Sequence, residues 1–195
     1  MSFISNPPHE EVSRRLEIAV KCVISKDSDL FNFKVNERTV TQRLALYLEQ
    51  AFEPLGYGLK ADCEYNRMWI ESGEGECNLT KKYPELSGLK PDVEDSDGVT
   101  VFPDVIVHLR GKRFANVLVI EAKRDAPVGA VPDNDRIKLY EFTRMDGGFR
   151  YPWGAFLNFR YVPSPCGREH RVVTIVDVVW FRDGKAVTTS QIQMP

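Results

Sequence analysis

Three charged side chains lie in or at the end of two strongly apolar segments near the middle of the chain. Asp104 is close to the start of segment 102–110, and Glu121 and Lys123 are close to the end of segment 116–124. A short link containing glycine separates the two segments, which favours a β-hairpin. Carboxylates and an ammonium group are the side chains that together can bind a divalent cation and act on a phosphate.

The register of this hairpin decides whether the three groups meet. If Arg110 pairs with Ala115 across the turn, Asp104 lies directly opposite Glu121. Side chains alternate between the two faces of a strand, so Lys123 shares the face of Glu121. Two opposed carboxylates repel each other, and partial burial would force one to take up a proton or the strands to separate. A divalent cation between them removes this conflict.

The resulting hypothesis is a magnesium-type site. Hard cations take carboxylate oxygens, backbone carbonyls and water, so we expect Asp104 and Glu121 to be ligands and the carbonyl of Ala122 to be a further one. Lys123 would orient or help to deprotonate a metal-bound water and stabilise charge on an attacked phosphate. The simpler interpretation, an ordinary ion pair of Glu121 with Lys123 at a strand end, leaves Asp104 unexplained.

A fourth carboxylate stands at the start of a predicted helix over 37–52. Asn36 is a good N-cap for it, and Glu37 lies on the same helical face as Leu44 and Leu48, the face that must pack on the sheet. Glu37 can therefore reach the site from the side. It would bind the metal directly, bind a second metal, or act through water.

These motifs resemble the PD-(D/E)XK nuclease superfamily, which is restriction-endonuclease-like. Pro103-Asp104 followed by Glu121-Ala122-Lys123 after a hairpin is similar to its sequence motif, and Glu37 is similar to the acidic residue of its upstream helix. The resemblance covers about 36–161 and is to small uncharacterised prokaryotic members. It implies an αβββαβ core with a mixed central sheet flanked by helices, and a nuclease that uses magnesium or manganese.

The resemblance also implies roles for individual residues. Asp104 and Glu121 would be metal ligands, Lys123 the catalytic lysine and Glu37 the helix carboxylate. Members often carry a polar residue on the helix that follows the E-x-K strand. Asp135 and Lys138 are the candidates here, with Lys138 preferred as a phosphate or water contact.

Weaker candidates lie upstream of the hairpin. Glu64 could approach the metal and Arg67 a phosphate, although polar residues on an edge strand explain both as well. Pro91-Asp92 is a second Pro-Asp pair, but no apolar strand follows it, so Pro103-Asp104 is the better match to the motif. His108 shares the predicted face of Asp104 but is too far along the strand, so we expect it to be structural.

The elements needed to position these groups follow from hydrophobic periodicity and turn residues. The order is that of an α/β domain in which helices cover a mixed sheet. We interpret the whole chain, 1–195, as one domain, with 72–100 a long loop or an insertion. The predicted helices are 8–25, 37–52 and 133–145, and the predicted strands are 59–67, 102–110, 116–124, 153–161, 171–181 and a short strand near 186–189.

Composition limits the possible partners. The 195 residues include 26 Lys plus Arg and 28 Asp plus Glu, for a net charge of -2, which argues against a broad basic surface that coats nucleic acid. No apolar run approaches the roughly 18–20 residues that span a bilayer, and none near the start resembles a signal peptide. We therefore expect a soluble cytoplasmic protein with no membrane partner. The four cysteines form no C-x-x-C pair and are expected to be free thiols.

The function predicted from these features is metal-dependent hydrolysis of phosphodiester bonds in nucleic acid, DNA more than RNA, by a metal-activated water. A homodimer is plausible, because cutting two strands requires two sites. The alternative is a nucleic-acid-binding or assembly module on the same fold with weak or no activity. A third possibility is a metal-dependent hydrolase that acts on a small nucleotide.

Overall fold

The computed structural model describes residues 7–33, 35–65, 67–72, 75–80, 82–83, 93–95, 98–112, 115–163 and 171–194. For 67–100, 162–163 and 171 it describes the backbone alone. The Pro91-Asp92 pair lies outside these residues.

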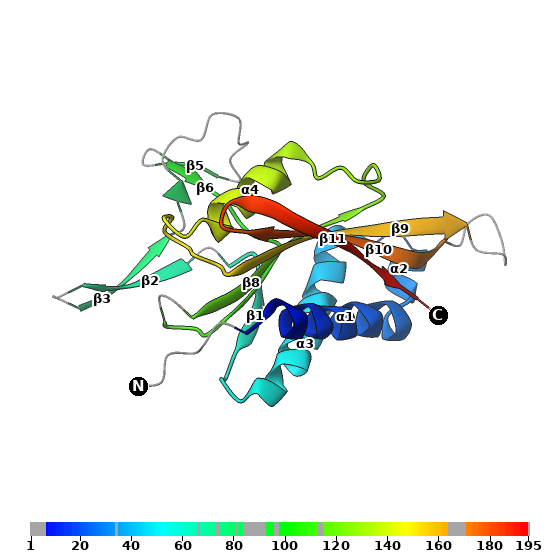
Figure 1. Cartoon of the computed structure of the whole chain (residues 1–195), viewed down its shortest axis with the longest axis horizontal. Helices are drawn as coiled ribbons and strands as arrows, with labels where there is room; N and C mark the ends of the chain where they lie inside the picture. Colours follow the sequence, from blue (N-terminus) through cyan, green and yellow to red (C-terminus); the bar gives the residue numbers. More distant parts are fainter. Residues whose placement is uncertain are drawn as a thin grey trace.

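A six-stranded mixed sheet forms the centre of the molecule (Figure 1). Each strand is antiparallel to its neighbours in the sheet, except that the third and fourth strands run parallel to each other. The order across the sheet is β1 (Lys60–Cys63), β7 (Val105–His108), β8 (Asn116–Arg124), β9 (Trp153–Pro163), β10 (Arg171–Arg182) and β11 (Lys185–Gln193).

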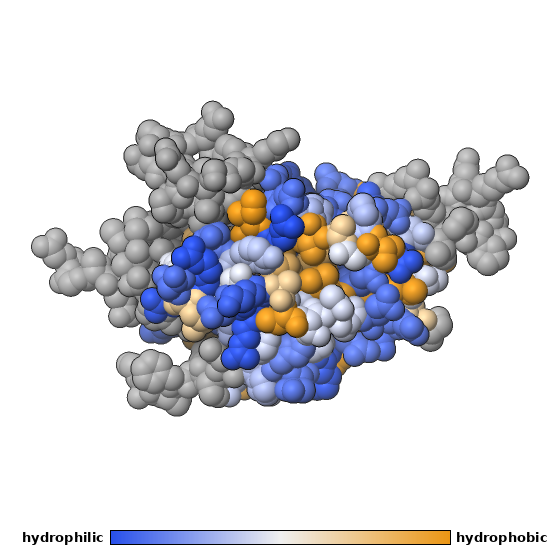
Figure 2. All heavy atoms as spheres, turned by 45° about the horizontal axis from the view of Figure 1, so that its top comes forward, coloured by the Kyte–Doolittle hydropathy of each residue, from blue (hydrophilic) through white to orange (hydrophobic). Residues whose placement is uncertain are grey.

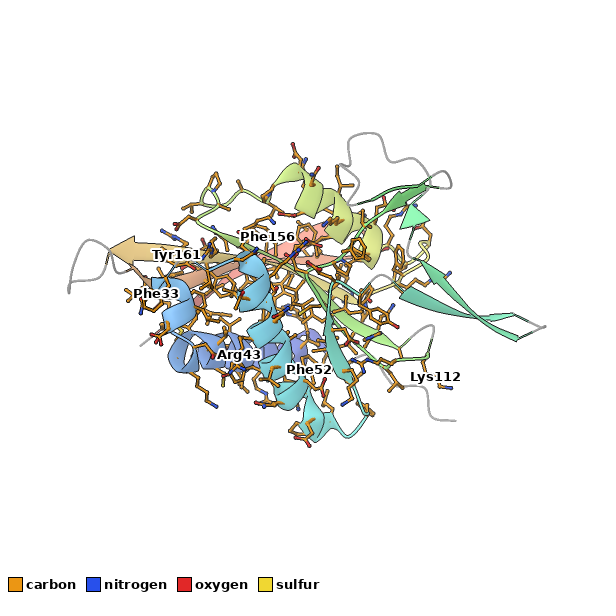
Figure 3. The ribbon with its side chains drawn as sticks, turned by 180° about the vertical axis from the view of Figure 1, so that it is seen from behind. Phe33, Arg43, Phe52, Lys112, Phe156 and Tyr161 are labelled. Carbon is orange, nitrogen blue, oxygen red and sulfur yellow. The ribbon has the colours of Figure 1, made fainter. Side chains whose placement is uncertain are left out.

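Helices cover both faces of this sheet, which confirms the predicted α/β architecture (Figure 1). Helices α1 (His9–Lys26) and α3 (Glu37–Phe52) lie on one face, and α4 (Asp133–Thr143) lies on the other. Figure 3, the view from behind, shows α3 in front of α1, with Arg43 along the helix and Phe52 toward its end. The short helices α2 (Asp29–Asn32) and η1 (Glu53–Leu55) follow α1 and α3 respectively.

Alternation along the strands divides the interior into two cores. Val105 and Val107 pack with the α1 and α3 side chains, whereas Ile106 between them packs with the α4 side. Gly154 lets α4 approach β9 closely, because a Cβ there would lie 2.9 Å from Cγ2 of Thr143. The position of α4 on the sheet therefore depends on a residue that has no side chain.

The outer part of the α4 face carries apolar groups that α4 does not cover. Figure 2 brings this face forward and shows apolar side chains among hydrophilic ones. A cavity of about 360 Å³ lies here, lined by residues that include Val128, Phe156 and Val179.

The region 72–100, predicted to be a loop or insertion, contains short strands in its described parts. β2 (Arg67–Ser72) and β3 (Gly75–Thr80) form a two-stranded sheet. β4 (Lys82–Tyr83), β6 (Gly98–Thr100) and β5 (Val93–Asp95) form a three-stranded one. Both are separate from the central sheet.

Three further predictions of element boundaries need correction. The strand predicted over 102–110 is β7, which spans only Val105–His108, so Asp104 lies just before it. The strand predicted over 59–67 is β1, which ends at Cys63 because Glu64 adopts a left-handed backbone conformation with φ 49°. The short last strand predicted near 186–189 extends over Lys185–Gln193, since it pairs with β10 along nearly its whole length. No helix in the described part of the chain is both long and apolar enough to cross a membrane.

Candidate active site

The register between β7 and β8 brings the two sequence motifs together. Val105 pairs with Ile120, the register that places Asp104 opposite Glu121. The assumed pairing of Arg110 with Ala115 is wrong, because the register shifts by one residue between Val107 and His108. The predicted register is therefore correct for Asp104 and Glu121, although the pair at the turn from which it was counted is not.

Asp104 is bonded directly to the neighbouring strand. Its Oδ2 accepts a hydrogen bond of 2.7 Å from the backbone N–H of Ala122. Burial raises the pKa of the Asp104 carboxyl, and the Ala122 amide and the Lys123 ammonium offset that rise only in part. One of the carboxylate oxygens is therefore anchored to β8, beside Glu121.

Glu121 is a fully buried carboxylate. Its side chain lies on β8 with no solvent exposure, and neither of its oxygens has a hydrogen-bond partner among the described residues. The nearest described cation is the ammonium of Lys138, whose Nζ lies 3.6 Å from Oε2. Burial raises the pKa of Glu121 well above its ordinary value, and the charge of Asp104 raises it further. A buried charge with so little compensation costs several kcal/mol unless a cation or a proton neutralises it.

Lys123 lies between two carboxylates from different helices. Its Nζ is 3.6 Å from Oε2 of Glu37 on α3 and 3.8 Å from Oδ2 of Asp135 on α4. Burial alone would lower the pKa of Lys123, but Asp135, Asp104 and the other nearby carboxylates raise it above its ordinary value. The ammonium form is therefore strongly favoured in this arrangement.

Glu37 reaches the site as predicted, and its described contacts are with Lys123 and with the β8 backbone. Its Oε1 accepts a hydrogen bond from the N–H of Arg124 at 3.3 Å. The Asn36 cap holds the start of α3, since its Oδ1 accepts from the N–H of Arg38 at 3.0 Å. Glu37 thus ties the start of α3 to the end of β8, and its role as a metal ligand stays a prediction.

The first turns of α4 add the two polar candidates of that helix. Lys138 is 9% exposed and Asp135 is 4% exposed. The Lys138 ammonium donates to the carbonyl of Phe102 at 3.0 Å, in addition to its ion pair with Glu121. Both residues therefore face the same charged cluster.

A cleft of about 510 Å³ opens onto this cluster. Elements from both faces of the sheet line it, and most of the lining side chains are charged or polar. The lining residues are Asn36, Glu37, Arg38, Thr41, Glu64, Phe102, Asp104, Lys123 and Lys138.

Among the described side chains, no group of three or more His, Cys, Asp or Glu residues is arranged to hold a metal ion. Asp104 lies opposite Glu121 across the hairpin, and Lys123 lies between two further carboxylates, Glu37 and Asp135. Magnesium usually takes one or two protein carboxylates and completes its shell with water and substrate phosphate. The orphaned oxygens of Glu121 beside Asp104 fit that kind of site.

Several contacts could not be read from the sequence. Arg38 lines the cleft and pairs with Glu64, so Glu64 contacts an arginine here. Asn158 is buried on β9 and exchanges two hydrogen bonds of 2.9 Å with the backbone of Ala126, just beyond β8. The sequence signal for the Asn158 contact was a single asparagine inside an otherwise apolar strand.

Two other candidates stand apart from the site. His108 is buried, its Nε2 lies 2.8 Å from Oδ2 of Asp62, and its ring packs on Tyr65. This arrangement confirms a structural histidine. The side chain of Arg67 lies outside the described residues, so its phosphate role stays a prediction. Cys22 and Cys63 are free, as expected.

Comparison with known proteins gives no family. No protein-family model matches the chain, and no curated protein matches it. Among solved structures, the crystal structure of SSO0001 aligns with all of this chain and 71% of its own chain, at 14% identity and a TM-score of 0.27. A similarity of this size establishes neither a fold family nor an activity.

Proposed function

We propose that the chain is a metal-dependent nuclease with a restriction-endonuclease-like core, which hydrolyses phosphodiester bonds in nucleic acid, DNA more than RNA. The observation that carries the proposal is Glu121. Among the described residues, this carboxylate has no hydrogen bond on either oxygen, no solvent exposure and a second, partly buried carboxylate beside it, so keeping it charged costs free energy. Such groups are typical of sites that bind a cation or transfer protons.

The order of the elements around the cleft supports this proposal. Helix α3 precedes β1, β7 and β8, and α4 then leads to β9, which runs parallel to β8. This is the helix, three strands, helix and strand order that the resemblance to the PD-(D/E)XK superfamily implies. The short strands between β1 and β7 would be an insertion in that core.

The described residues suit magnesium or manganese. Asp104 and Glu121 would hold the cation, and the carbonyl of Ala122 and the carboxylate of Glu37 are further candidates. When bound, such a cation polarises a phosphoryl oxygen and makes water more acidic. Around the fully buried Glu121 the effective dielectric constant is lower than in water, which strengthens these interactions.

The lysines supply the remaining charge. Lys123 stays protonated among Glu37, Asp135 and Asp104, so it is suited to orient a water and to stabilise negative charge on the phosphate. Removing a proton from water is a poorer assignment for a lysine with a raised pKa. Lys138 would contact either the water or a phosphate oxygen from the α4 side.

The overall charge is compatible with local binding of nucleic acid. The net charge of -2 gives no broad basic surface, but three cations, Arg38, Lys123 and Lys138, line the cleft. A bound divalent cation would make the cleft less negative than its carboxylates suggest. The protein would then engage the backbone near the scissile bond rather than along a long footprint.

Incubation of the purified chain with plasmid, linear duplex, single-stranded DNA and RNA tests the proposal. Each substrate is offered in magnesium, in manganese and in EDTA, with a short dinucleotide included to detect a hydrolase of small nucleotides. We expect cleavage of at least one polymer in magnesium or manganese and none in EDTA. Cleavage that persists in EDTA, or no cleavage of any polymer, would refute it.

One observation favours the alternative of a binding or assembly module. Lys138 already lies 3.6 Å from Glu121, so a protein cation stands close to where a metal would bind. If Lys138 neutralises Glu121 permanently, the chain would bind nucleic acid without cutting it. Replacement of Lys138 by Met separates the two cases, since the binding module gains metal affinity and the nuclease loses activity.

A further inference from the structure

An arginine and a glutamate meet at the cleft, outside the cluster around Lys123. The guanidinium Nε of Arg38, on the first turn of α3, lies 2.7 Å from Oε1 of Glu64, which follows β1. Both residues line the cleft of about 510 Å³ that also holds Asp104, Lys123 and Lys138. The pair therefore joins two elements across the space that a substrate would enter.

Solvent reaches this pair freely. The Arg38 side chain is 74% exposed and the Glu64 side chain 46% exposed. Exposed ion pairs contribute little to stability, because water and salt screen them. A ligand that offers a better partner to either group can therefore separate the pair at small cost.

The backbone at Glu64 connects the pair to the metal-site motif. Glu64 has φ 49°, a left-handed conformation that is uncommon for a residue other than glycine. Its N–H donates to the carbonyls of Pro103 and Asp104, at 3.1 and 3.3 Å. These hydrogen bonds hold the backbone of Glu64 beside the Pro-Asp motif.

We propose that Arg38 is a phosphate-binding residue of this cleft and that Glu64 occupies its guanidinium until a nucleic-acid phosphate replaces it. A phosphate offers the planar guanidinium two oxygens and a greater charge than a carboxylate. Glu64 then acts as a counterion that keeps Arg38 extended toward the cleft and weakens binding of anything less charged than a phosphodiester strand. This inference rests on the proposed function for the identity of its ligand, but it requires binding and not cleavage.

Anisotropy of a labelled single-stranded DNA, measured in EDTA over a range of salt concentrations, tests the proposal, with duplex DNA and RNA as further probes. We expect Arg38→Ala to weaken binding about tenfold and to reduce the slope of log affinity against log salt by about 0.7. We expect Glu64→Gln to tighten binding about two- to fivefold, because it releases Arg38. The double variant should bind like Arg38→Ala, since Glu64 acts through Arg38.

Matched controls exist on α1, away from the cleft. Arg14 is 55% exposed and pairs with Glu11, and Glu17 is 47% exposed and pairs with Lys21 at 2.7 Å. Arg14→Ala and Glu17→Gln change the net charge equally and should leave affinity and slope nearly unchanged. Thermal melting of each variant confirms that it is folded.

The outcomes separate this inference from the nuclease proposal. Loss of affinity in Arg38→Ala without any cleavage by the wild type supports the phosphate site and refutes the nuclease. Cleavage with the same affinity and salt slope in Arg38→Ala and Arg14→Ala overturns the phosphate site alone. The inference also fails if the wild type binds none of the three probes. It fails as well if adding Glu64→Gln to Arg38→Ala tightens binding as much as adding it to the wild type.

Discussion

The backbone N–H of Ala122 donates a hydrogen bond of 2.7 Å to Oδ2 of Asp104. The peptide unit between Glu121 and Ala122 is thereby tied to the carboxylate of the neighbouring chain segment, and the two halves of the motif are held as one unit. The Glu121 carboxylate on the same sheet face has no hydrogen-bond partner in the part of the chain that the structure describes. The arrangement favours a neutral or cation-bound Glu121 over a bare charge.

Glu121→Gln is expected to stabilise the metal-free protein. It removes a buried charge for which Lys138 compensates only in part, and it keeps the shape of the side chain. Each unit by which the folded pKa exceeds the unfolded one costs about 1.4 kcal/mol, so we expect the free energy of unfolding in EDTA at neutral pH to rise by about 1–2 kcal/mol, as measured by urea denaturation. Manganese should raise the melting temperature of the wild type and not that of the variant. A variant that is less stable than the wild type in EDTA, yet still stabilised by manganese, contradicts the assignment.

The same carboxylate predicts a pH dependence of stability. Its pKa in the folded state lies above its ordinary value of 4.5, so over the interval between them the folded state holds a proton that the unfolded state has released. The stability that this group contributes is therefore present below pH 4.5 and is lost as the pH rises through the pKa of the folded state. In EDTA, the advantage of Glu121→Gln over the wild type should be small at acid pH and grow toward neutral pH. A constant difference, or one that grows toward acid pH, would show that Glu121 is not the cause.

Lys123→Met is expected to slow cleavage by about a hundredfold or more, since in the proposed mechanism it removes the cation that would stabilise charge on the phosphate. Binding of manganese should persist, because Asp104 and Glu121 remain. Lys123→Arg keeps the charge and should retain part of the activity. Lys60→Met is the control, since Lys60 forms an ion pair with Glu49 outside the cleft. Equal rates for Lys123→Met and Lys60→Met would remove Lys123 from the mechanism.

The packing of α4 gives a test that does not involve charge. Gly154→Ala would place a Cβ 2.9 Å from Thr143 and 3.2 Å from Leu139, both on α4. We expect a loss of about 1–3 kcal/mol in the free energy of unfolding. Activity should also fall, because α4 carries Asp135 and Lys138. Gly148→Ala serves as the control, since no atom of the described residues lies within 4 Å of its added Cβ. If the two variants are equally stable, α4 is not packed on β9 as described.

Local signals were enough to predict the elements that carry the site. The helix Glu37–Phe52 and the strand Asn116–Arg124 have the predicted bounds, because an asparagine cap starts the one and a continuous apolar run defines the other. The convergence of Asp104 and Glu121 followed from hairpin pairing, which needs only short-range information. The register shift at His108 could not be predicted in this way, since it depends on backbone geometry near the turn and not on a residue type.

Contacts between elements that are distant in the sequence could not be predicted from local sequence patterns. The ion pairs of Lys138 with Glu121 and of Arg38 with Glu64 depend on where α4 and α3 pack on the sheet. That placement is set by tertiary features such as Gly154, which looks like any other glycine in a strand sequence. Periodicity therefore predicted which helix faces turn inward but not which charged side chains meet at their ends.

The central claim is that Asp104 and Glu121 together hold the cation that cleavage requires. The most direct test is the magnesium-dependent cleavage rate of Asp104→Asn and Glu121→Gln beside Glu49→Gln, an acidic position outside the cleft. We predict that cleavage is abolished in the first two variants, each still folded by thermal melting, and unchanged in the third. Cleavage at the wild-type rate by either Asp104→Asn or Glu121→Gln would contradict the account.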